Sequence, residues 1–156
     1  MNSLILLTGI PGTGKTTLAE NLKDQFGYTH IDLEIPWHDG TFPKDEEGFK
    51  HLIDEIRGEK IIITWGFPTW LPHYIRYIEG KGYKHIWLDG DRDAAFKNFM
   101  KRENNDAEKE KAYFVQVNAV NHDKTIEILK PSVYDPFLPD GSFKPIAERA
   151  EAIINL

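Results

Sequence analysis

The sequence predicts an α/β fold, a three-layer sandwich in which helices cover both faces of a parallel sheet. Short apolar segments of strand length alternate along the chain with longer segments whose apolar residues recur at helical spacing. Strands separated by helices pair in parallel, because a helical crossover returns the chain to the end of the sheet where it can start another parallel strand. The length of 156 residues suits one domain, and we expect residues 1–156 to form it.

The first part of the chain supplies two strands and two helices. Residues 3–8 are a continuous apolar run that is too short for a helix. Residues 16–26 carry apolar side chains at helical spacing and end at a glycine, a typical helix stop. A strand is predicted at 28–32, followed by a loop rich in proline and glycine. A helix with one apolar face then covers 46–57 and also ends at a glycine.

The remaining elements continue this alternation. The strand at 60–64 contains Ile61, Ile62 and Ile63, a run that suits burial on both faces of a sheet. The last predicted helix has a proline in its first turn, where the missing N–H costs nothing. Further strands are predicted at 83–88 and, more weakly, at 132–134, and helices at 72–79, 93–101, 107–130 and 145–155.

The composition excludes several classes of protein. There is no cysteine, which removes disulfide scaffolds, iron–sulfur clusters, thiolate zinc sites and cysteine nucleophiles. With 25 acidic and 19 basic side chains the net charge is −6, which argues against a nucleic acid or an anionic membrane as partner. No segment approaches the roughly 20 apolar residues of a membrane span. We therefore expect a cytoplasmic protein that does not enter a membrane.

A phosphate-binding loop is predicted at residues 9–16, Gly-Ile-Pro-Gly-Thr-Gly-Lys-Thr, between the first strand and the first helix. It fits G-x-x-x-x-G-K-[ST] at every fixed position. The glycines let consecutive N–H groups curl around a phosphate, and the helix N-terminus adds positive partial charge. Lys15 is expected to bridge the β- and γ-phosphates, and the Thr16 hydroxyl to bind Mg²⁺. The predicted nucleotide-binding residues are Gly9, Pro11, Gly12, Thr13, Gly14, Lys15, Thr16 and Thr17.

With this loop near the start of a short chain of alternating strands and helices, the sequence resembles the small P-loop kinases, among them shikimate, gluconate and nucleoside-monophosphate kinases. The resemblance implies a five-stranded parallel sheet of order 2-3-1-4-5, with ATP and Mg²⁺ as cofactors. It also implies an acceptor-binding region after the second strand, at residues 34–57, and a short lid after the fourth, at residues 102–112.

The resemblance points to further candidate catalytic residues beside Lys15. Asp32 and Glu34 match an acidic pair at the end of the second strand in shikimate and gluconate kinases. Asp32 is the candidate general base or a ligand that holds Mg²⁺, and Glu34 a candidate acceptor contact; either could instead cap a turn. Arg102 matches the arginine that meets the transferring phosphate at the end of the helix after the fourth strand. A solvated helix end is the alternative for Arg102.

Candidate acceptor contacts follow from the same resemblance. Lys50 stands where shikimate kinase has an acceptor-binding arginine, although lysine lacks the bidentate fork and a surface lysine is the alternative. Trp65 and Gly66 lie where relatives carry a glycine-containing segment. Aromatic side chains on two adjacent loops could stack a flat ring or simply pack in the core. They are Trp37, Phe42, Trp65, Phe67 and Trp70.

Residues 140–145 connect the last strand to the last helix, where the family cradles adenine mainly with backbone groups. The position of this segment, rather than its residue types, suggests the contact. A structural turn is the alternative.

These observations favour an ATP- and Mg²⁺-dependent kinase that transfers the γ-phosphoryl group to a small acceptor: a hydroxyl metabolite, a nucleoside or a nucleotide. One alternative is a nucleotide-binding switch or NTPase that acts on a protein partner, although the third strand ends in Thr64 and Trp65 rather than in an acidic residue. A kinase acting on a base or an end in DNA or RNA is the other, against which the net charge of −6 counts. The sequence leaves the acceptor and the oligomeric state open.

Overall fold

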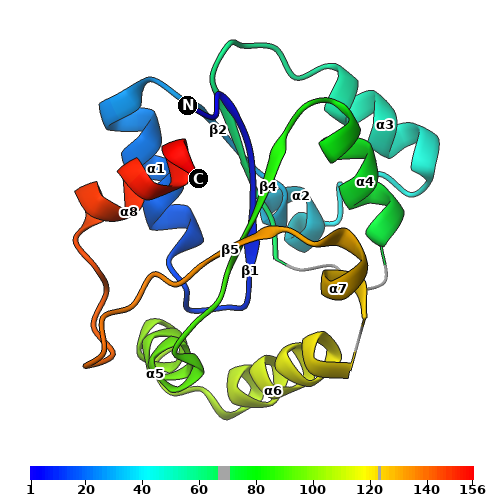
Figure 1. Ribbon diagram of the computed structural model, residues 1–156. Coiled ribbons are helices and arrows are strands. Elements are labelled where there is room, and N and C mark those ends of the chain that lie inside the picture. The colour runs from blue at the N-terminus through cyan, green and yellow to red at the C-terminus, as the bar shows by residue number, and fades with distance from the viewer. Residues whose placement is uncertain (67–70, 123) are drawn as a thin grey trace.

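The computed structural model describes residues 1–66, 71–122 and 124–156. Its sheet is parallel throughout and has the strand order β2-β3-β1-β4-β5, which confirms the predicted topology (Figure 1). Leu4 pairs with Ile61 on one side of the central strand, and Ile5 pairs with Lys84 on the other. The strands are β1 (Leu4–Gly9), β2 (Thr29–Asp32), β3 (Ile61–Thr64), β4 (Lys84–Leu88) and β5 (Ser132–Tyr134).

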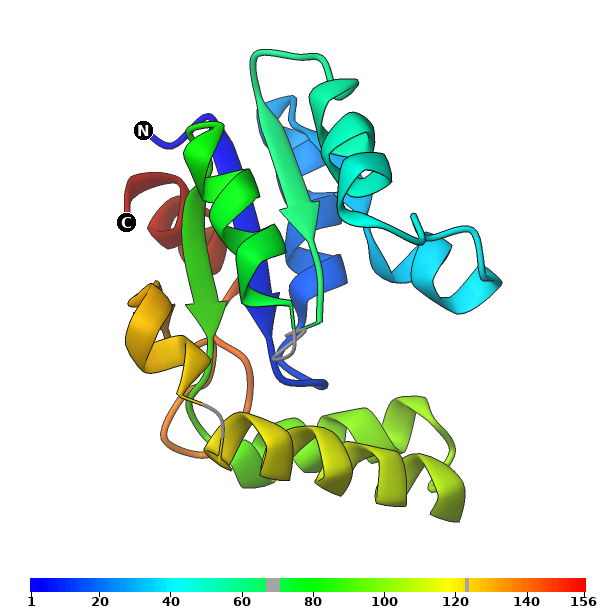
Figure 2. The same cartoon turned by 90° about the vertical axis from the view of Figure 1, so that its right-hand side faces the viewer.

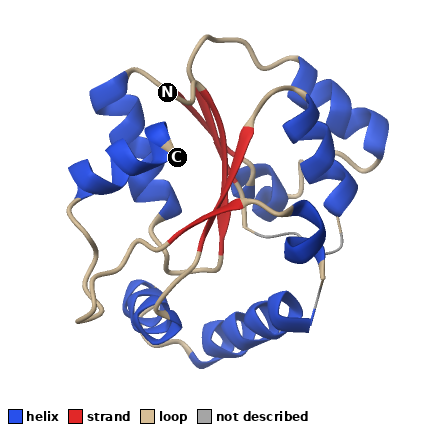
Figure 3. Cartoon of the chain, viewed as in Figure 1, coloured by secondary structure: helices blue, strands red, loops and turns tan. Residues whose placement is uncertain are grey.

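Helices cover both faces of this sheet (Figure 3). On one face lie α1 (Lys15–Phe26) and α8 (Ile146–Asn155), and on the other α3 (Glu46–Asp54), α4 (Pro72–Gly80) and α7 (Thr125–Leu129). Beyond the carboxyl ends of the strands lie α5 (Arg92–Arg102) and α6 (Ala107–His122), and α2 (Glu34–Asp39) follows β2 (Figure 2). Among the described residues, no helix combines the length and the apolar character needed to cross a bilayer.

The core has two halves because successive residues of β1 face opposite sides of the sheet. Ile5 and Leu7 pack against α1 and α8, whereas Leu6 packs against α3 and α4. All three are fully buried, and each such side chain contributes about 1.5–3 kcal/mol of burial free energy. The sheet is thereby a rigid base, and the loops at the carboxyl ends of its strands take their positions from it.

Two sequence expectations were wrong. Residues 34–39 were expected in a loop but form α2, because Asp32 Oδ1 accepts the Glu34 N–H and Gly40, at φ +77°, ends the helix in the left-handed conformation. The helix expected at 107–130 is two helices, α6 and α7, with residue 123 outside the described ones. They have different packing partners: α6 lies on α5 through Tyr113, whereas α7 lies beside α4 and places Leu129 in the core.

Candidate active site

The phosphate loop runs from the end of β1 to the start of α1 and is fixed from both sides. Gly12 and Gly14 have φ of +84° and +81°, which favour glycine. A side chain on Gly12 would overlap the Ala95 carbonyl oxygen on α5. The Thr13 hydroxyl donates to the Ile10 carbonyl oxygen at 2.8 Å, and Asn98 Nδ2 donates to the Gly12 carbonyl oxygen at 3.0 Å. Helix α5 therefore holds the loop in shape.

This shape leaves a row of backbone donors unused. Leu18 is the first residue of α1 whose N–H bonds to a backbone carbonyl, that of Gly14. Within the described part of the chain, the N–H groups of residues 12–17 make no hydrogen bond. Unused N–H groups at a helix N-terminus form an anion-binding site. The loop thus fits the phosphates of a nucleotide, and the exposed Thr16 at its end fits an oxygen ligand for their Mg²⁺.

Lys15 lies folded against the loop, with Nζ donating to the carbonyl oxygens of Gly9 and Ile10 at 2.9 and 3.0 Å. Burial lowers the pKa of Lys15 from 10.5 to about 8; the charge of Glu34 opposes this shift, that of Arg102 adds to it, and that of Asp32 opposes it. The three charges come from β2, α2 and α5. The tertiary structure therefore brings together four residues that the sequence singled out from separate elements.

The lowered pKa of Lys15 predicts proton uptake when ADP binds above pH 8. Free Lys15 is then largely neutral, and a phosphate beside it favours the charged form and raises its pKa again. Calorimetry of ADP binding at about pH 8.5, in buffers of different ionisation enthalpy, measures this uptake. The Lys23→Met variant of the same helix should take up the same fraction of a proton. A binding enthalpy that does not depend on the buffer would contradict the prediction.

The two acidic residues predicted at the end of the second strand, Asp32 and Glu34, have different hydrogen-bond partners. Asp32 Oδ1 accepts the backbone N–H of Glu34 at 3.0 Å, and Asp32 Oδ2 makes no hydrogen bond to another described residue. Glu34 accepts the N–H of Gly66 with Oε1 and pairs with His38 Nε2 at 3.2 Å through Oε2. Glu34 therefore joins α2 to the segment after β3, while Asp32 keeps an oxygen available near Lys15.

Arg102 ends α5 with an exposed side chain. Its Nε lies 3.2 Å from Glu103 Oε1, and its guanidinium lies over the Phe99 ring at 5.3 Å from the centroid. The chain then turns through Asn104 and Asn105, both with positive φ, before α6 begins. Residues 102–112, predicted as a short lid, thus comprise the end of α5, this turn and the first residues of α6.

Two predicted acceptor contacts lie in other surroundings. Lys50 Nζ pairs with Glu46 at 3.1 Å and lies over the Tyr77 ring of α4 at 5.3 Å. Trp65 is 2% exposed and packs between Phe42 and Phe49, at centroid distances of 5.5 and 5.8 Å. For Lys50 these contacts are those of the surface lysine that the sequence left open as an alternative. For Trp65 they are those of the core packing that it left open.

The other aromatic candidates differ in exposure. Trp37 on α2 is 38% exposed and meets the Phe42 ring edge-on at 5.0 Å. Phe67 and Trp70 lie outside the described residues. Of the described aromatic candidates, Trp37 therefore presents the most accessible ring.

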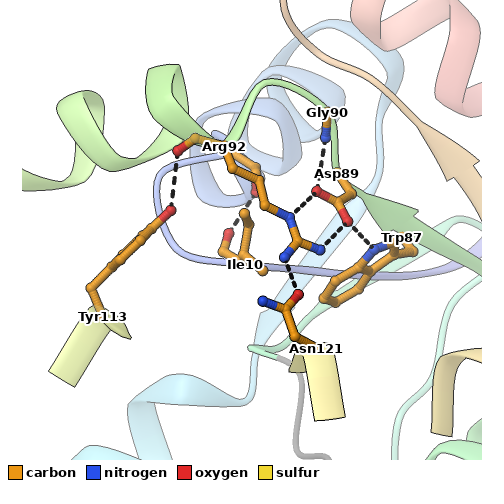
Figure 4. Close-up of polar contacts among 8 residues, drawn as sticks. Ile10, Trp87, Asp89, Gly90, Arg92, Tyr113 and Asn121 are labelled. Atoms are coloured by element: carbon orange, nitrogen blue, oxygen red, sulfur yellow. Dashed lines mark hydrogen bonds and ion pairs between the residues drawn. The ribbon is translucent and has the colours of Figure 1, made fainter. Parts of the chain in front are cut away.

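The sequence did not predict a hydrogen-bond network around Asp89 and Arg92, which lies near the phosphate loop (Figure 4). Asp89, after β4, accepts from Trp87 Nε1 at 3.1 Å and binds Arg92 through both carboxylate oxygens, at 3.2 and 2.9 Å. Arg92 Nη1 donates to Asn121 Oδ1 on α6, and the Tyr113 hydroxyl donates to the Arg92 carbonyl oxygen. Arg92 thus ties the start of α5 to the end of β4 and to α6.

A cavity of about 570 Å³ lies between α5 and the loop after β5. Its walls include Asn98, which also bonds the phosphate loop, and Phe143, which stacks on Phe137 at a centroid distance of 4.8 Å. The cavity has the size of a small-ligand site. It adjoins the segment 140–145 that the sequence singled out for adenine.

Comparisons with known proteins agree with this geometry. A family model described as an AAA domain matches residues 5–127. A shikimate kinase from Staphylococcus haemolyticus (strain JCSC1435) is 30% identical over 170 aligned residues, which cover 99% of this chain and 94% of the relative. The chain belongs to the small P-loop kinases. This kinase is a phosphotransferase of the small-molecule type.

Solved structures share the fold of this small P-loop kinase. A shikimate kinase from Bacteroides thetaiotaomicron superposes with a TM-score of 0.64 at 18% identity, over 100% of both chains. A gluconokinase from Sinorhizobium meliloti 1021 gives a TM-score of 0.62 at 14% identity, over 99% of this chain and 90% of that one.

Sequence reasoning missed residues that shape the kinase site from α5 and α8. Asn98 holds the phosphate loop, and Arg149 packs behind it. The loop motif carries no information about distant residues that touch it. The helical spacing of α5 does indicate which of its residues share a face, but not that this face meets Gly12.

Proposed function

We propose that the protein is an ATP- and Mg²⁺-dependent kinase that transfers the γ-phosphoryl group of ATP to a hydroxyl group of a small acceptor. The row of unused N–H groups at the start of α1, beside the Lys15 ammonium that lies folded against the loop, is the observation that carries the proposal. Phosphoryl transfer needs positioning and charge stabilisation more than covalent help. The membership in the small P-loop kinases supports the same reaction.

Each residue near Lys15 has a proposed role. Residues 9–17 hold the phosphates of ATP, and Thr16 contributes an oxygen to its Mg²⁺. Asp32 accepts the proton of the acceptor hydroxyl or holds the Mg²⁺ through water. Arg102 stabilises negative charge on the transferring phosphoryl group, and the segment 102–112 that it begins is the proposed lid.

The acceptor is proposed to bind beside α2. Asp32 keeps one carboxylate oxygen without a described hydrogen bond, and Trp37 offers an accessible ring. Glu34 pairs with His38, and Lys50 pairs with Glu46. A carboxylate oxygen that faces the acceptor disfavours an anionic acceptor and favours an uncharged hydroxyl compound or a nucleoside. The relatives named for shikimate and gluconate make hydroxy acids the necessary comparison.

A coupled assay of ATP turnover, with and without candidate acceptors, tests the proposal. We expect turnover to be near zero without an acceptor and to rise with one member of a panel of nucleosides, sugars and hydroxy acids. A thermal-shift screen with an unreactive ATP analogue selects the panel, because a bound acceptor raises the melting temperature. Fast hydrolysis without an acceptor, stimulated by a protein, would instead support the nucleotide-switch alternative.

Asp32→Asn should lower kcat by roughly 10²- to 10⁴-fold while the KM for ATP changes little, because an amide cannot accept the proton. The matched control is Asp39→Asn, since Asp39 Oδ1 also accepts the N–H of the residue two positions later, Thr41. Steady-state kinetics of both variants measure the effect. Equal kcat values for the two variants would refute the role of Asp32.

A further inference from the structure

Arg149 on α8 is a buried cation that has no acidic partner in the described part of the chain. It is 6% exposed, and its Nε donates to the Lys144 carbonyl oxygen at 2.9 Å. Among the residues that the structure describes, no carboxylate forms an ion pair with Arg149, and its two Nη atoms make no hydrogen bond. Burying an unpaired charge is costly, so such a residue needs an independent reason to be there.

The guanidinium lies directly behind the phosphate loop. A Cβ built on Gly14 would lie 3.2 Å from Arg149 Nη1 and 3.3 Å from Phe143 Cε1. Gly14 is the residue before α1 and lies within residues 12–17, whose unused N–H groups point out of the start of the helix. Two positive features, the helix N-terminus and the guanidinium, thus lie side by side, an arrangement that an anion stabilises.

The same guanidinium also lies against the aromatic wall of the cavity beside α5. It lies over the Phe143 ring at 4.7 Å from the centroid, and Phe143 stacks on Phe137. Both phenylalanines line the cavity beside α5. Arg149 therefore connects the phosphate loop to the wall of this cavity.

We propose that Arg149 is a nucleotide-positioning residue whose charge favours a nucleoside polyphosphate over an uncharged nucleoside. The proposal rests on the ATP-dependent kinase function given above. In a site of low dielectric the unpaired charge attracts the phosphates. The stack of the guanidinium on Phe143 holds the cavity wall at a fixed position relative to Gly14. Because Arg149 lies against the phosphate loop and Phe143, which are proposed to hold the nucleotide throughout the reaction, we expect this binding to be equal in the ground and transition states.

The test compares ADP with adenosine, both measured by calorimetry. In Arg149→Met we expect ADP affinity to fall by on the order of tenfold relative to adenosine affinity, since a charge-assisted contact is lost. The KM for ATP should rise similarly while kcat is kept. In Arg149→Lys, which restores the charge, the ratio of ADP to adenosine affinity should return to within about threefold of the wild-type value.

The matched control is Arg76→Met, which removes one positive charge from the exposed face of α4, where Arg76 donates to the Ile128 carbonyl oxygen. It should leave both affinities unchanged. If Arg149→Met does not fold, Arg149→Gln replaces it, because the amide can still donate to the Lys144 carbonyl oxygen.

An unchanged ratio of ADP to adenosine affinity in the neutral variant overturns the proposal, as does a lysine variant that behaves like the neutral one. Both results would leave Arg149 a packing residue only. If the wild type binds ADP and phosphorylates an acceptor, but the ratio of ADP to adenosine affinity is the same in Arg149→Met, only the role of Arg149 is refuted and the kinase function stands. Failure of the wild type to bind ADP would count against the kinase function itself.

Discussion

Lys15→Met should lower ATP-dependent phosphoryl transfer by roughly 10³-fold, because the charge that bridges the separating phosphates disappears. Methionine has a similar length and no charge, so the packing of the half-buried side chain is largely kept. The loss should appear mainly in kcat, since the charge on the leaving and transferring groups develops in the transition state. Single-turnover kinetics with an identified acceptor measure it.

The control for this variant is Lys23→Met on the same helix. Lys23 pairs with Glu20 at 3.2 Å on the exposed side of α1, so its loss should cost little stability and should not change activity. If Lys15→Met kept the activity of the control, the phosphate loop would not be the site of phosphoryl transfer.

Gly12→Ala should destabilise the protein by at least about 3 kcal/mol and weaken ATP binding severely. The new Cβ would overlap the Ala95 carbonyl oxygen, and a backbone atom within α5 cannot move aside cheaply. The left-handed φ of +84° adds a cost of about 1–2 kcal/mol for any residue with a Cβ. Urea unfolding and the KM for ATP measure the two effects.

Gly27→Ala separates the two costs. Gly27 has a similar φ of +76° at the end of α1, but a Cβ there meets nothing within 4 Å. This variant should therefore lose only the backbone cost of about 1–2 kcal/mol and should keep its KM for ATP. Equal losses for both variants would show that contact with α5 contributes nothing to the phosphate loop.

The sequence predicted most of the sheet because each strand carries its own signal. The run Ile61 to Ile63 reads as a buried strand wherever it lies, and the glycines that end the helices mark the connections. The order of the strands came from the family resemblance rather than from periodicity. Where signals were weak, the prediction failed: α2 has a proline within it, and the break between α6 and α7 follows from their packing partners.

For the candidate site, too, the sequence identified the residues that belong to a local motif and could not assign those whose role depends on packing. Residues 9–16 are adjacent in sequence, and their motif specifies a backbone shape, so the sequence alone identified the phosphate loop. Trp65 carried no comparable signal: the same aromatic side chain suits a binding loop or a core, and its burial between Phe42 and Phe49 depends on α3.

By itself, the sequence determined a parallel α/β fold with a phosphate loop at the end of its first strand, because local periodicity and a contiguous motif are written within single elements. Only the tertiary structure decided what surrounds that loop. Asp32 and Arg102 act on Lys15 from β2 and α5, and Arg149 lies behind Gly14 from α8. Such juxtapositions arise from the packing of distant elements on a common sheet, and they depend on distances that no local pattern encodes.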